Sequence, residues 1–367
     1  MTDIVINKEE QELRALADER REREFEELIK VLKLVTPGTP LRSAVDDMAR
    51  AGMGAMVVLS DSPEVLKVTN GGFKIDCKFS PQQLIELCKM DGAIVLSEDL
   101  KKIVYCNILL VPDSNISTSE TGTRHKAAER TAKQTLKAVI AVSERRKTIS
   151  LYYKDIKYVL RSSEEILSKA TETLRMLEKH KEILNELLIN LNILEFTNFT
   201  TMSDVLFPLQ RMEIMSRITE TIDKYIIELG IEGSLVRILL KEITKDLAKE
   251  KNLLLRDYSR NYEFTRTALP SLSFDEIIEP ENLVRILLYS SSSESVRSRG
   301  YRLLAKTSLD HEKIERIVSH FGELQSLMDT INLQSGRLIE LVGDKDAKKI
   351  VREIDALKEQ ALLGKKI

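Results

Sequence analysis

The chain changes its hydrophobic period near residue 160, and this change limits the folds open to it. Before that point, short apolar runs alternate with stretches of helical character. The apolar runs are Gly54–Ser60, Gly92–Leu96, Lys102–Val111 and Lys137–Val142. Runs of this length, bounded by glycine, aspartate and proline, are typical of buried strands. The alternation predicts an α/β domain with a central mixed sheet in residues 1–160.

The residues between the runs predict the helices of this domain. A stretch rich in Glu, Arg, Leu and Ala over 8–33 indicates a first helix. It ends at Thr36–Pro40, because proline lacks the backbone N–H and glycine permits a tight turn. Further helices are expected over 40–51, 81–90 and 124–135, and a closing hairpin is expected over 149–160.

After residue 160 the strand-like runs disappear and the period becomes helical. From Ser163 to Phe196, apolar residues recur with the spacing of a coiled-coil seam, at Ala170, Leu174, Leu177, Leu184, Leu188 and Leu191. The same period continues over 204–229 and 234–255, so residues 161–289 are expected to form a helical spine. A serine-rich linker over 290–300 precedes a further helical segment, and residues 290–367 are assigned to a third domain.

Composition excludes several classes of protein. The chain has 56 basic and 58 acidic residues and a formal net charge of −2, so any nucleic-acid binding must come from a local patch. Cys77, Cys88 and Cys106 match no zinc spacing and are expected to be reduced structural thiols. No apolar run approaches the roughly 20 residues needed to span a membrane. The polar segment Met1–Glu12 lacks a signal-peptide core, and a cytoplasmic location is expected.

The densest chemical signal is the segment Glu120–Arg130, ETGTRHKAAER. Glycine and threonine open a helix here, and a helix start presents free backbone N–H groups that suit an anion. Arg124, His125 and Lys126 follow in succession and favour a triphosphate cradle. Cations at a helix start oppose the helix dipole, and this unfavourable placement itself points to an anion. The alternative is a capped helix with a solvated basic first turn.

A second signal is Asp91-Gly92 at an expected helix-to-strand junction. A carboxylate there suits Mg²⁺ or Mn²⁺, or the deprotonation of a hydroxyl, and the glycine lets a ligand approach the backbone. The alternative is an ordinary turn. His180, His311 and His320 lie in helical segments without metal-ligand neighbours and are expected to be surface or packing residues.

These motifs resemble those of the diadenylate cyclases of the DNA-integrity scanning (DisA) family. Asp91–Ala93 resembles the family's Asp-Gly-Ala motif, and Gly122–Lys126 resembles its Gly-Thr-Arg-His-Arg motif. Further matches in the cyclase region are Thr36–Leu41, Gly71–Phe73, Phe79–Pro81, Leu84–Asp91, Val111–Asp113, Ser119–Gly122, Ala132–Thr135 and Ser143–Arg146. Others, beyond residue 160, are Glu228–Gly230, Glu232-Gly233, Arg299–Leu304 and Phe321-Gly322.

The resemblance implies an enzyme that joins two ATP molecules into cyclic di-AMP with loss of two pyrophosphates. It implies catalytic roles for Asp91, Arg124 and His125, with Asp91 also holding Mg²⁺ or Mn²⁺. The ATP contacts that it implies are Gly92, Leu110, Thr123, Arg124, His125, Lys126, Ala127 and Ser143. Because one cyclase domain holds one ATP, it further implies self-association, with a homo-octamer as the expected assembly, and branched DNA as a partner.

Two departures from the family pattern fall in the cyclase motif. The second arginine is Lys126 here, which keeps the charge but loses the bidentate fork, so phosphate contact is expected to weaken. The next residue, commonly threonine, is Ala127, so a hydroxyl contact is lost. These departures are the support for one alternative function, a DNA-binding scaffold whose cyclase domain binds nucleotide without turnover.

The tail departs further. The family ends in a helix-hairpin-helix whose two glycines present N–H groups to DNA phosphates, whereas Leu341–Lys345 holds one glycine and an acidic Asp344. Weak DNA binding is expected through Gly343, Lys345, Lys348 and Lys349. The alternatives are a helical packing module and, for the whole chain, a cyclase that has lost DNA sensing.

Overall fold

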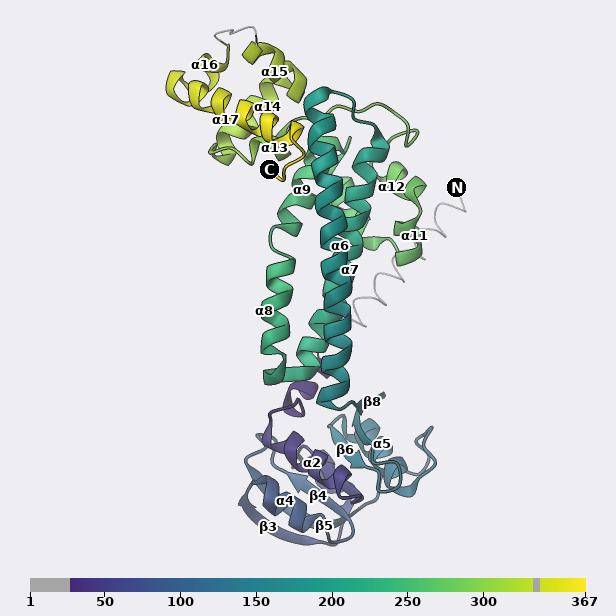
Figure 1. Cartoon of the computed structure of the whole chain (residues 1–367). Coiled ribbons are helices and arrows are strands. Elements are labelled where there is room, and N and C mark those ends of the chain that lie inside the picture. The colour runs from purple at the N-terminus through teal and green to yellow at the C-terminus, as the bar shows by residue number, and fades with distance from the viewer. Residues whose placement is uncertain (1–26, 333–336) are drawn as a thin grey trace, which may run out of the picture. The chain divides into compact units, whose positions relative to one another are not determined.

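The computed structural model describes residues 27–332 and 337–367 of the chain, which divide into two compact units (Figure 1). The first unit extends to Ala170 and includes Lys224–Leu235. The second comprises Thr171–Asp223 and Val236–Ile367. Of the first predicted helix, residues 27–34 are helical and the rest lies outside the described residues. The predicted three-domain division stays an interpretation of the sequence.

The first unit is built on an eight-stranded mixed sheet. Its strands are β1 (Ala55–Val58), β2 (Thr69–Asn70), β3 (Phe73–Lys78), β4 (Ala93–Leu96), β5 (Lys102–Leu110), β6 (Val139–Val142), β7 (Ile149–Tyr153) and β8 (Ile156–Leu160). The order is β2-β5-β4-β1-β6-β7-β8, with β3 also paired to β5. Strands β1 and β4 are parallel, and the other pairs are antiparallel. The predicted α/β class of this region is therefore confirmed.

Helices cover both faces of the sheet and create two cores. On one face, α2 (Pro40–Arg50) and α4 (Pro81–Leu87) pack on Val57 and Ile94, among others. On the other face, α3 (Pro63–Lys67) and α5 (Thr123–Thr135) pack on Val58 and Val95. Strands β1, β4 and β6 are buried along their whole length, which explains why their sequences are continuous apolar runs.

Three elements of this unit were not predicted, namely α3, β2 and β3. Strand β3 has the sequence FKIDCK and no buried residue, so it shows no apolar run. It also carries Asp76 at φ 48° where its pairing with β5 shifts register. An irregular edge of this kind escapes a search for buried strands.

The second unit is helical. Parts of the long helices α6 (Ser163–Thr197) and α7 (Met202–Leu229) belong to it. Further helices are α8 (Ser234–Ile243), α9 (Leu247–Tyr258), α10 (Tyr262–Ala268), α11 (Phe274–Ile278), α12 (Pro280–Ile286), α13 (Tyr301–Leu304), α14 (His311–Phe321), α15 (Leu324–Asn332), α16 (Arg337–Val342) and α17 (Asp344–Leu362). Two short 3₁₀ helices are η1 (Gly230–Gly233), which belongs to the first unit, and η2 (Leu269–Ser271).

Two expectations for the helical region need correction. The period over 234–255 predicts continuous helix, but the helix breaks at Asp246, which adopts φ 62° between α8 and α9. The serine-rich segment over 290–300 is also not a free linker. Ser203 and Met202 donate backbone hydrogen bonds to Ser292 and Glu294 at 2.7 and 2.8 Å, so the segment is paired with the start of α7.

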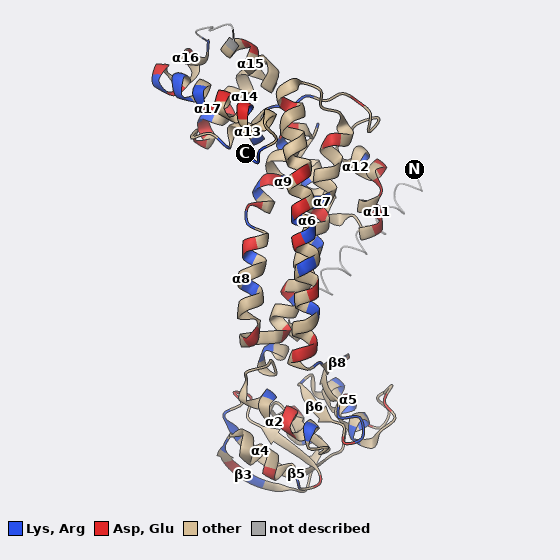
Figure 2. Cartoon of the chain, in the orientation of Figure 1, with Lys and Arg blue, Asp and Glu red and all other residues tan. Residues whose placement is uncertain are grey.

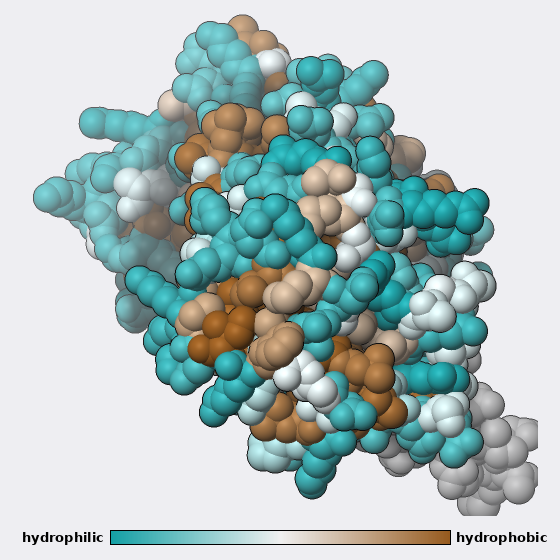
Figure 3. Space-filling view, turned by 90° about the horizontal axis from the view of Figure 1, so that it is seen from below, coloured by the Kyte–Doolittle hydropathy of each residue, from teal (hydrophilic) through white to brown (hydrophobic). Residues whose placement is uncertain are grey.

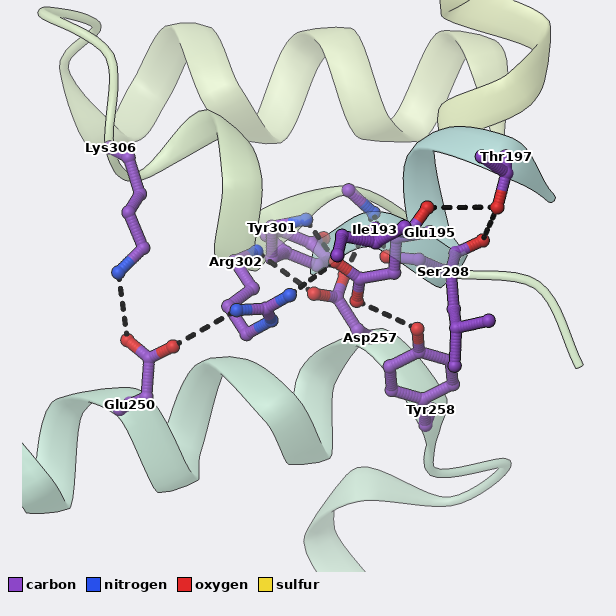
Figure 4. Close-up of polar contacts among 12 residues, drawn as sticks. Ile193, Glu195, Thr197, Glu250, Asp257, Tyr258, Ser298, Tyr301, Arg302 and Lys306 are labelled. Carbon is purple, nitrogen blue, oxygen red and sulfur yellow. Dashed lines mark hydrogen bonds and ion pairs between the residues drawn. The ribbon is translucent and has the colours of Figure 1, made fainter. Parts of the chain in front are cut away.

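A buried polar network joins α6, α9 and α13 in the second unit (Figure 4). The fully buried Arg302 pairs with the fully buried Glu195, which also accepts a hydrogen bond from the Tyr258 hydroxyl at 2.7 Å. Asp257 caps α13 by accepting from the backbone N–H groups of residues 300–302 at 2.7 to 2.9 Å. Among the described residues, no helix is long and apolar enough to cross a membrane.

Candidate nucleotide site

Four strands of the first unit bring predicted site residues to one edge of the sheet. Val57 pairs with Ile94 in the parallel β1–β4 pair, and Ala55 pairs with Val142 in the antiparallel β1–β6 pair. Continued to residue 54, these registers place Gly54 between Asp91 and Ser143. Strand β5 runs antiparallel to β4 and ends at the buried Leu110 at the same edge.

Gly92 is required where β4 begins. Its φ is +95°, a conformation that side chains rarely adopt. A Cβ atom there would lie 2.8 Å from the carbonyl carbon of Asn107 and 2.9 Å from the carbonyl oxygen of Ile108, which are rigid backbone atoms of β5. Gly92 therefore holds Asp91 at a fixed place on the edge. The Asp91 side chain is exposed and makes no ion pair with any described residue.

Helix α5 starts at Gly122 without a side-chain cap and without an acidic residue in its first turn. The first intrahelical bond runs from the Lys126 N–H to the Gly122 carbonyl at 2.9 Å. The N–H groups of residues 123–125 have no acceptor among the described residues, and Arg124 projects from this turn. Uncapped N–H groups beside cationic side chains are the features that predict an anion site.

The loop that leads into α5 is fixed to the helix that follows it. The Arg130 Nε donates to the Ile116 carbonyl at 2.8 Å, and the Lys133 Nζ donates to the Ser117 carbonyl at 3.0 Å. Alanines at 128 and 132 face the sheet and are fully buried, which lets the helix lie close to the sheet. These contacts set where the first turn of α5 begins.

Arg124 lies over Gly54. A Cβ atom on Gly54 would be 2.1 Å from the Arg124 Nη1 and 2.8 Å from its Cζ. The buried Cys88 thiol is another neighbour. Burial raises the pKa of Cys88 to about 12, and the nearby Arg124 charge opposes that rise. Gly54 therefore leaves the space that the guanidinium occupies, and its role was not predicted from the sequence because glycine before a strand is common.

His125 lies beside Tyr152, whose hydroxyl is fixed by a carboxylate. Its ring meets the edge of Tyr152 at a centroid distance of 6.4 Å, and the Tyr152 hydroxyl donates to Glu120 Oε1 at 2.8 Å. Glu120 also pairs with Lys157 at 2.5 Å. Burial lowers the pKa of His125 from its usual value, while the Glu120 carboxylate acts in the opposite direction. Tyr152 was missed because, in the sequence, it is one more alternating residue of a strand.

The other predicted residues of this site lie around the same turn. Lys126 is half-buried and has no carboxylate partner among the described residues. Ala127 packs against the core beneath α5, and Thr123 is the first residue of the helix. Ser143 accepts a hydrogen bond from the Arg146 N–H at 3.2 Å and so stabilises the turn into β7.

A metal ion at this site would have Asp91 as its protein ligand. Within 27–332 and 337–367, no group of three or more His, Cys, Asp or Glu side chains is arranged to hold a metal. Mg²⁺ commonly binds through one or two carboxylates together with substrate phosphates and water. One exposed carboxylate on the same sheet edge as the candidate anion site fits that mode.

The predicted DNA-contacting residues lie in the second unit, at the start of α17. Helices α16 and α17 meet at Gly343, whose φ is +88°. Its N–H donates to the Ile339 carbonyl at 2.8 Å, so this donor already has an acceptor within the protein. Lys348 pairs with Asp344 at 2.8 Å, and Lys349 lies 3.9 Å from Glu353. Lysine and acidic side chains thus alternate along α17 (Figure 2).

Two family models match the chain. The model for the DisA bacterial checkpoint controller nucleotide-binding region matches residues 42–156, and the model for its linker region matches residues 160–296. The DNA integrity scanning protein DisA of Clostridium botulinum (strain 657 / Type Ba4) is 42% identical over 346 residues, covering 92% of this chain and 98% of that protein.

A second relative shows a similar identity and a similar coverage of both chains. The DNA integrity scanning protein DisA of Clostridium acetobutylicum is 40% identical over 347 residues, covering 93% of this chain and 97% of that protein. A crystal structure of a double mutant of DacA from Staphylococcus aureus is 23% identical over 41% of this chain and 97% of that one, with a TM-score of 0.28, too low to support an argument. On the two family models and the identities over nearly the whole length, the chain belongs to the DisA family of diadenylate cyclases.

Proposed function

We propose that this enzyme condenses two ATP molecules into cyclic di-AMP and two pyrophosphates. The observation that supports this best is the position of Arg124 beside the edge that carries Asp91, at the uncapped start of α5. In each half-reaction the 3′-oxygen of one ATP forms a bond to the α-phosphorus of the other. The bond from that phosphorus to the pyrophosphate oxygen breaks, and the proton of the 3′-hydroxyl is released.

The residues of this chain would contribute mainly by positioning and charge. The free N–H groups of residues 123–125 and the Arg124 guanidinium would bind the triphosphate, and His125 would donate a hydrogen bond to a phosphate oxygen. Asp91 would hold Mg²⁺ or Mn²⁺ with the phosphate oxygens, and such an ion supplies further neutralisation of the developing charge. Because the Asp91 carboxylate is exposed, a metal ion and the phosphate oxygens could both reach it.

A single copy of the site binds one nucleotide, so the reaction requires two copies facing each other. Large apolar side chains on the surface of the first unit support such self-association: Phe73 is 60% exposed and Leu109 is 63% exposed, both on neighbouring strands. Figure 3 shows apolar patches between hydrophilic side chains on one surface of the molecule. The family resemblance favours a homo-octamer, which light scattering would measure.

The test uses Asp91→Asn in the full chain, with ATP and Mn²⁺, and identifies the product by mass. We expect loss of cyclic di-AMP with unchanged folding, because Asp91 is exposed and unpaired among the described residues. Asp155→Asn, an exposed carboxylate in the β7–β8 turn, is the matched control and should keep activity. Near-normal activity of Asp91→Asn would remove that carboxylate from the mechanism.

We also propose that the tail binds DNA weakly, without sequence preference and with strong salt dependence. Of the three lysines, only Lys345 is without a carboxylate within ion-pair distance among the described residues, so net attraction to phosphates is small. An assembly presents several tails and a junction presents several arms, so branched DNA should bind better than linear duplex.

The corresponding test titrates labelled junction and duplex at two salt concentrations. The variant replaces Lys345, Lys348 and Lys349 with alanine, and an equal number of exposed lysines on the first unit, Lys74, Lys89 and Lys101, serves as control. Equal binding by the triple variant and the wild type, or no binding by the wild type at low salt, would leave a cyclase without DNA sensing through this segment.

A further inference from the structure

The second unit contains a cavity of about 270 Å³ that is separate from the nucleotide site. Its walls come from α6, from the segment that joins α8 to α9 with the start of α9, from α13 and its following turn, and from the last residues of the chain. Neither the predicted cyclase residues nor the predicted DNA contacts line it. Its volume suits a small ion or molecule and is below the range typical of nucleotide-sized ligands.

The cavity carries an excess of positive charge. Five cations line it, namely Lys181, Lys245, Arg302, Lys306 and Lys366, against three anionic groups, the carboxylates of Asp246 and Glu250 and the α-carboxylate at Ile367. Glu250 is already engaged, since Arg302 Nη1 lies 3.3 Å and Lys306 Nζ lies 3.5 Å from its oxygens (Figure 4).

The other three lysines have no carboxylate within ion-pair distance among the described residues. Lys181 donates only to the Lys245 carbonyl, at 3.4 Å. Burial lowers the pKa of Lys181 and the nearby Lys366 charge lowers it further, while the carboxylates of Asp246 and Glu250 act in the opposite direction. Cations that face each other across a cavity repel, and an anion between them would relieve that repulsion.

Two buried polar groups in the lining also lack hydrogen-bond partners. The Nε of Arg302, a side chain with no exposed surface, has no acceptor among the described residues. The side-chain oxygen of Asn192, which is 3% exposed, has no donor. Buried groups of this kind are rare because each unmade hydrogen bond costs about 1 to 3 kcal/mol. Water in the cavity would satisfy either group, whereas an anion would accept from the Arg302 Nε and leave the Asn192 oxygen to a water molecule.

We propose that this cavity binds a small, multiply charged phosphate anion of the size of orthophosphate or pyrophosphate. The several converging lysines match an ion with charge spread over many oxygens better than they match a monocarboxylate. Because residues of α6, α9 and α13 line the cavity, a bound anion would contact all three helices at once. Binding therefore stabilises the second unit.

The test is calorimetric titration of pyrophosphate, and separately of orthophosphate, into the full chain carrying Arg124→Ala. That background weakens anion binding at the nucleotide site. Binding should remain and should weaken at least tenfold in Lys181→Gln and in Lys366→Gln. Lys249→Gln is the matched control, because Lys249 is exposed on α9 and does not line the cavity. Equal affinities in Lys181→Gln and Lys249→Gln would overturn the proposal.

Amide hydrogen exchange locates the bound anion independently of activity. Pyrophosphate should slow exchange over 181–192 and 245–250, and Lys181→Gln should remove that protection. Protection confined to 122–127 would mean that the anion binds only at the nucleotide site, and the proposal would be wrong. If pyrophosphate does not bind to the Arg124→Ala variant at all, the proposal would also be wrong. Failure of the proposed cyclase activity leaves this result unaffected.

Discussion

Gly54→Ala is the change that most directly tests the geometry of the nucleotide site. The backbone at Gly54 does not adopt a positive φ, so an alanine is not strained there. Its methyl group would, however, lie 2.1 Å from the Arg124 Nη1. The guanidinium is the far end of a flexible side chain, so it would move and the fold would not. Stability should therefore stay within about 1 kcal/mol of the wild type.

The expected loss follows from how far Arg124 must move. Ordinary contact begins near 3.4 Å, so the guanidinium must retreat by about 1.3 Å from the methyl group. A misplacement of about 1 Å in a catalytic site can cost roughly 100-fold in rate. We therefore expect kcat/KM for ATP to fall about 100-fold, which corresponds to about 2.7 kcal/mol of transition-state stabilisation.

A double-mutant cycle separates this cause from a general disturbance of the sheet edge. If Gly54→Ala acts through Arg124, it should have no further effect in an Arg124→Ala background. The assay measures cyclic di-AMP formation by mass, with urea unfolding as the control for stability. Additive losses in the double mutant, or wild-type activity of Gly54→Ala, would refute the assignment of Arg124 to the triphosphate.

Three other predictions follow from the same structure. Lys126→Arg should keep or raise kcat/KM, because Lys126 has no carboxylate partner among the described residues and arginine restores a bidentate group; a severe loss would show a pocket built around lysine. Arg302→Met should destabilise the second unit by about 3 to 5 kcal/mol in chemical denaturation, since it leaves the Glu195 charge buried without its cation. Adding Glu195→Gln, which removes that charge and keeps an acceptor for the Tyr258 hydroxyl, should recover part of the loss. Because burial lowers the pKa of His125 in the folded state, its contribution to stability is present above about pH 6.5 and is lost as the pH falls through the folded pKa. His125→Gln should reduce the fall in urea midpoint on acidification below that pH, and an unchanged pH profile would contradict this.

Much of the site could be predicted from the sequence because its strands are buried on both faces. Such strands appear as continuous apolar runs, and the residues just outside them fall at sheet edges. Asp91 and Gly92 precede β4 in this way, and Ser143 follows β6. The helix start at Gly122 was equally visible, because glycine, threonine and a run of cations mark it.

The features that the sequence did not reveal depend on contacts between distant segments. Gly54 matters only because the Arg124 side chain lies over it, and Tyr152 matters only because its ring meets His125. The break at Asp246 has a similar origin: neither glycine nor proline marks it, and a left-handed residue within a helical period is not expected from propensity. Periodicity describes one element at a time and carries no information on such pairs.

The structure also bears on the alternative of a scaffold that binds nucleotide without turnover. That alternative depends on Lys126 and Ala127, which depart from the family pattern. Ala127 packs against the core beneath α5, and the N–H groups that would bind phosphate belong to residues 123–125, before either departure. The contacts that fix α5 on the sheet come from the alanines at 128 and 132 and from Arg130 and Lys133, so they do not involve the Lys126 side chain. The turn that we propose to bind the triphosphate therefore keeps its free N–H groups in this chain, and this geometry favours the proposed active cyclase over an inactive scaffold.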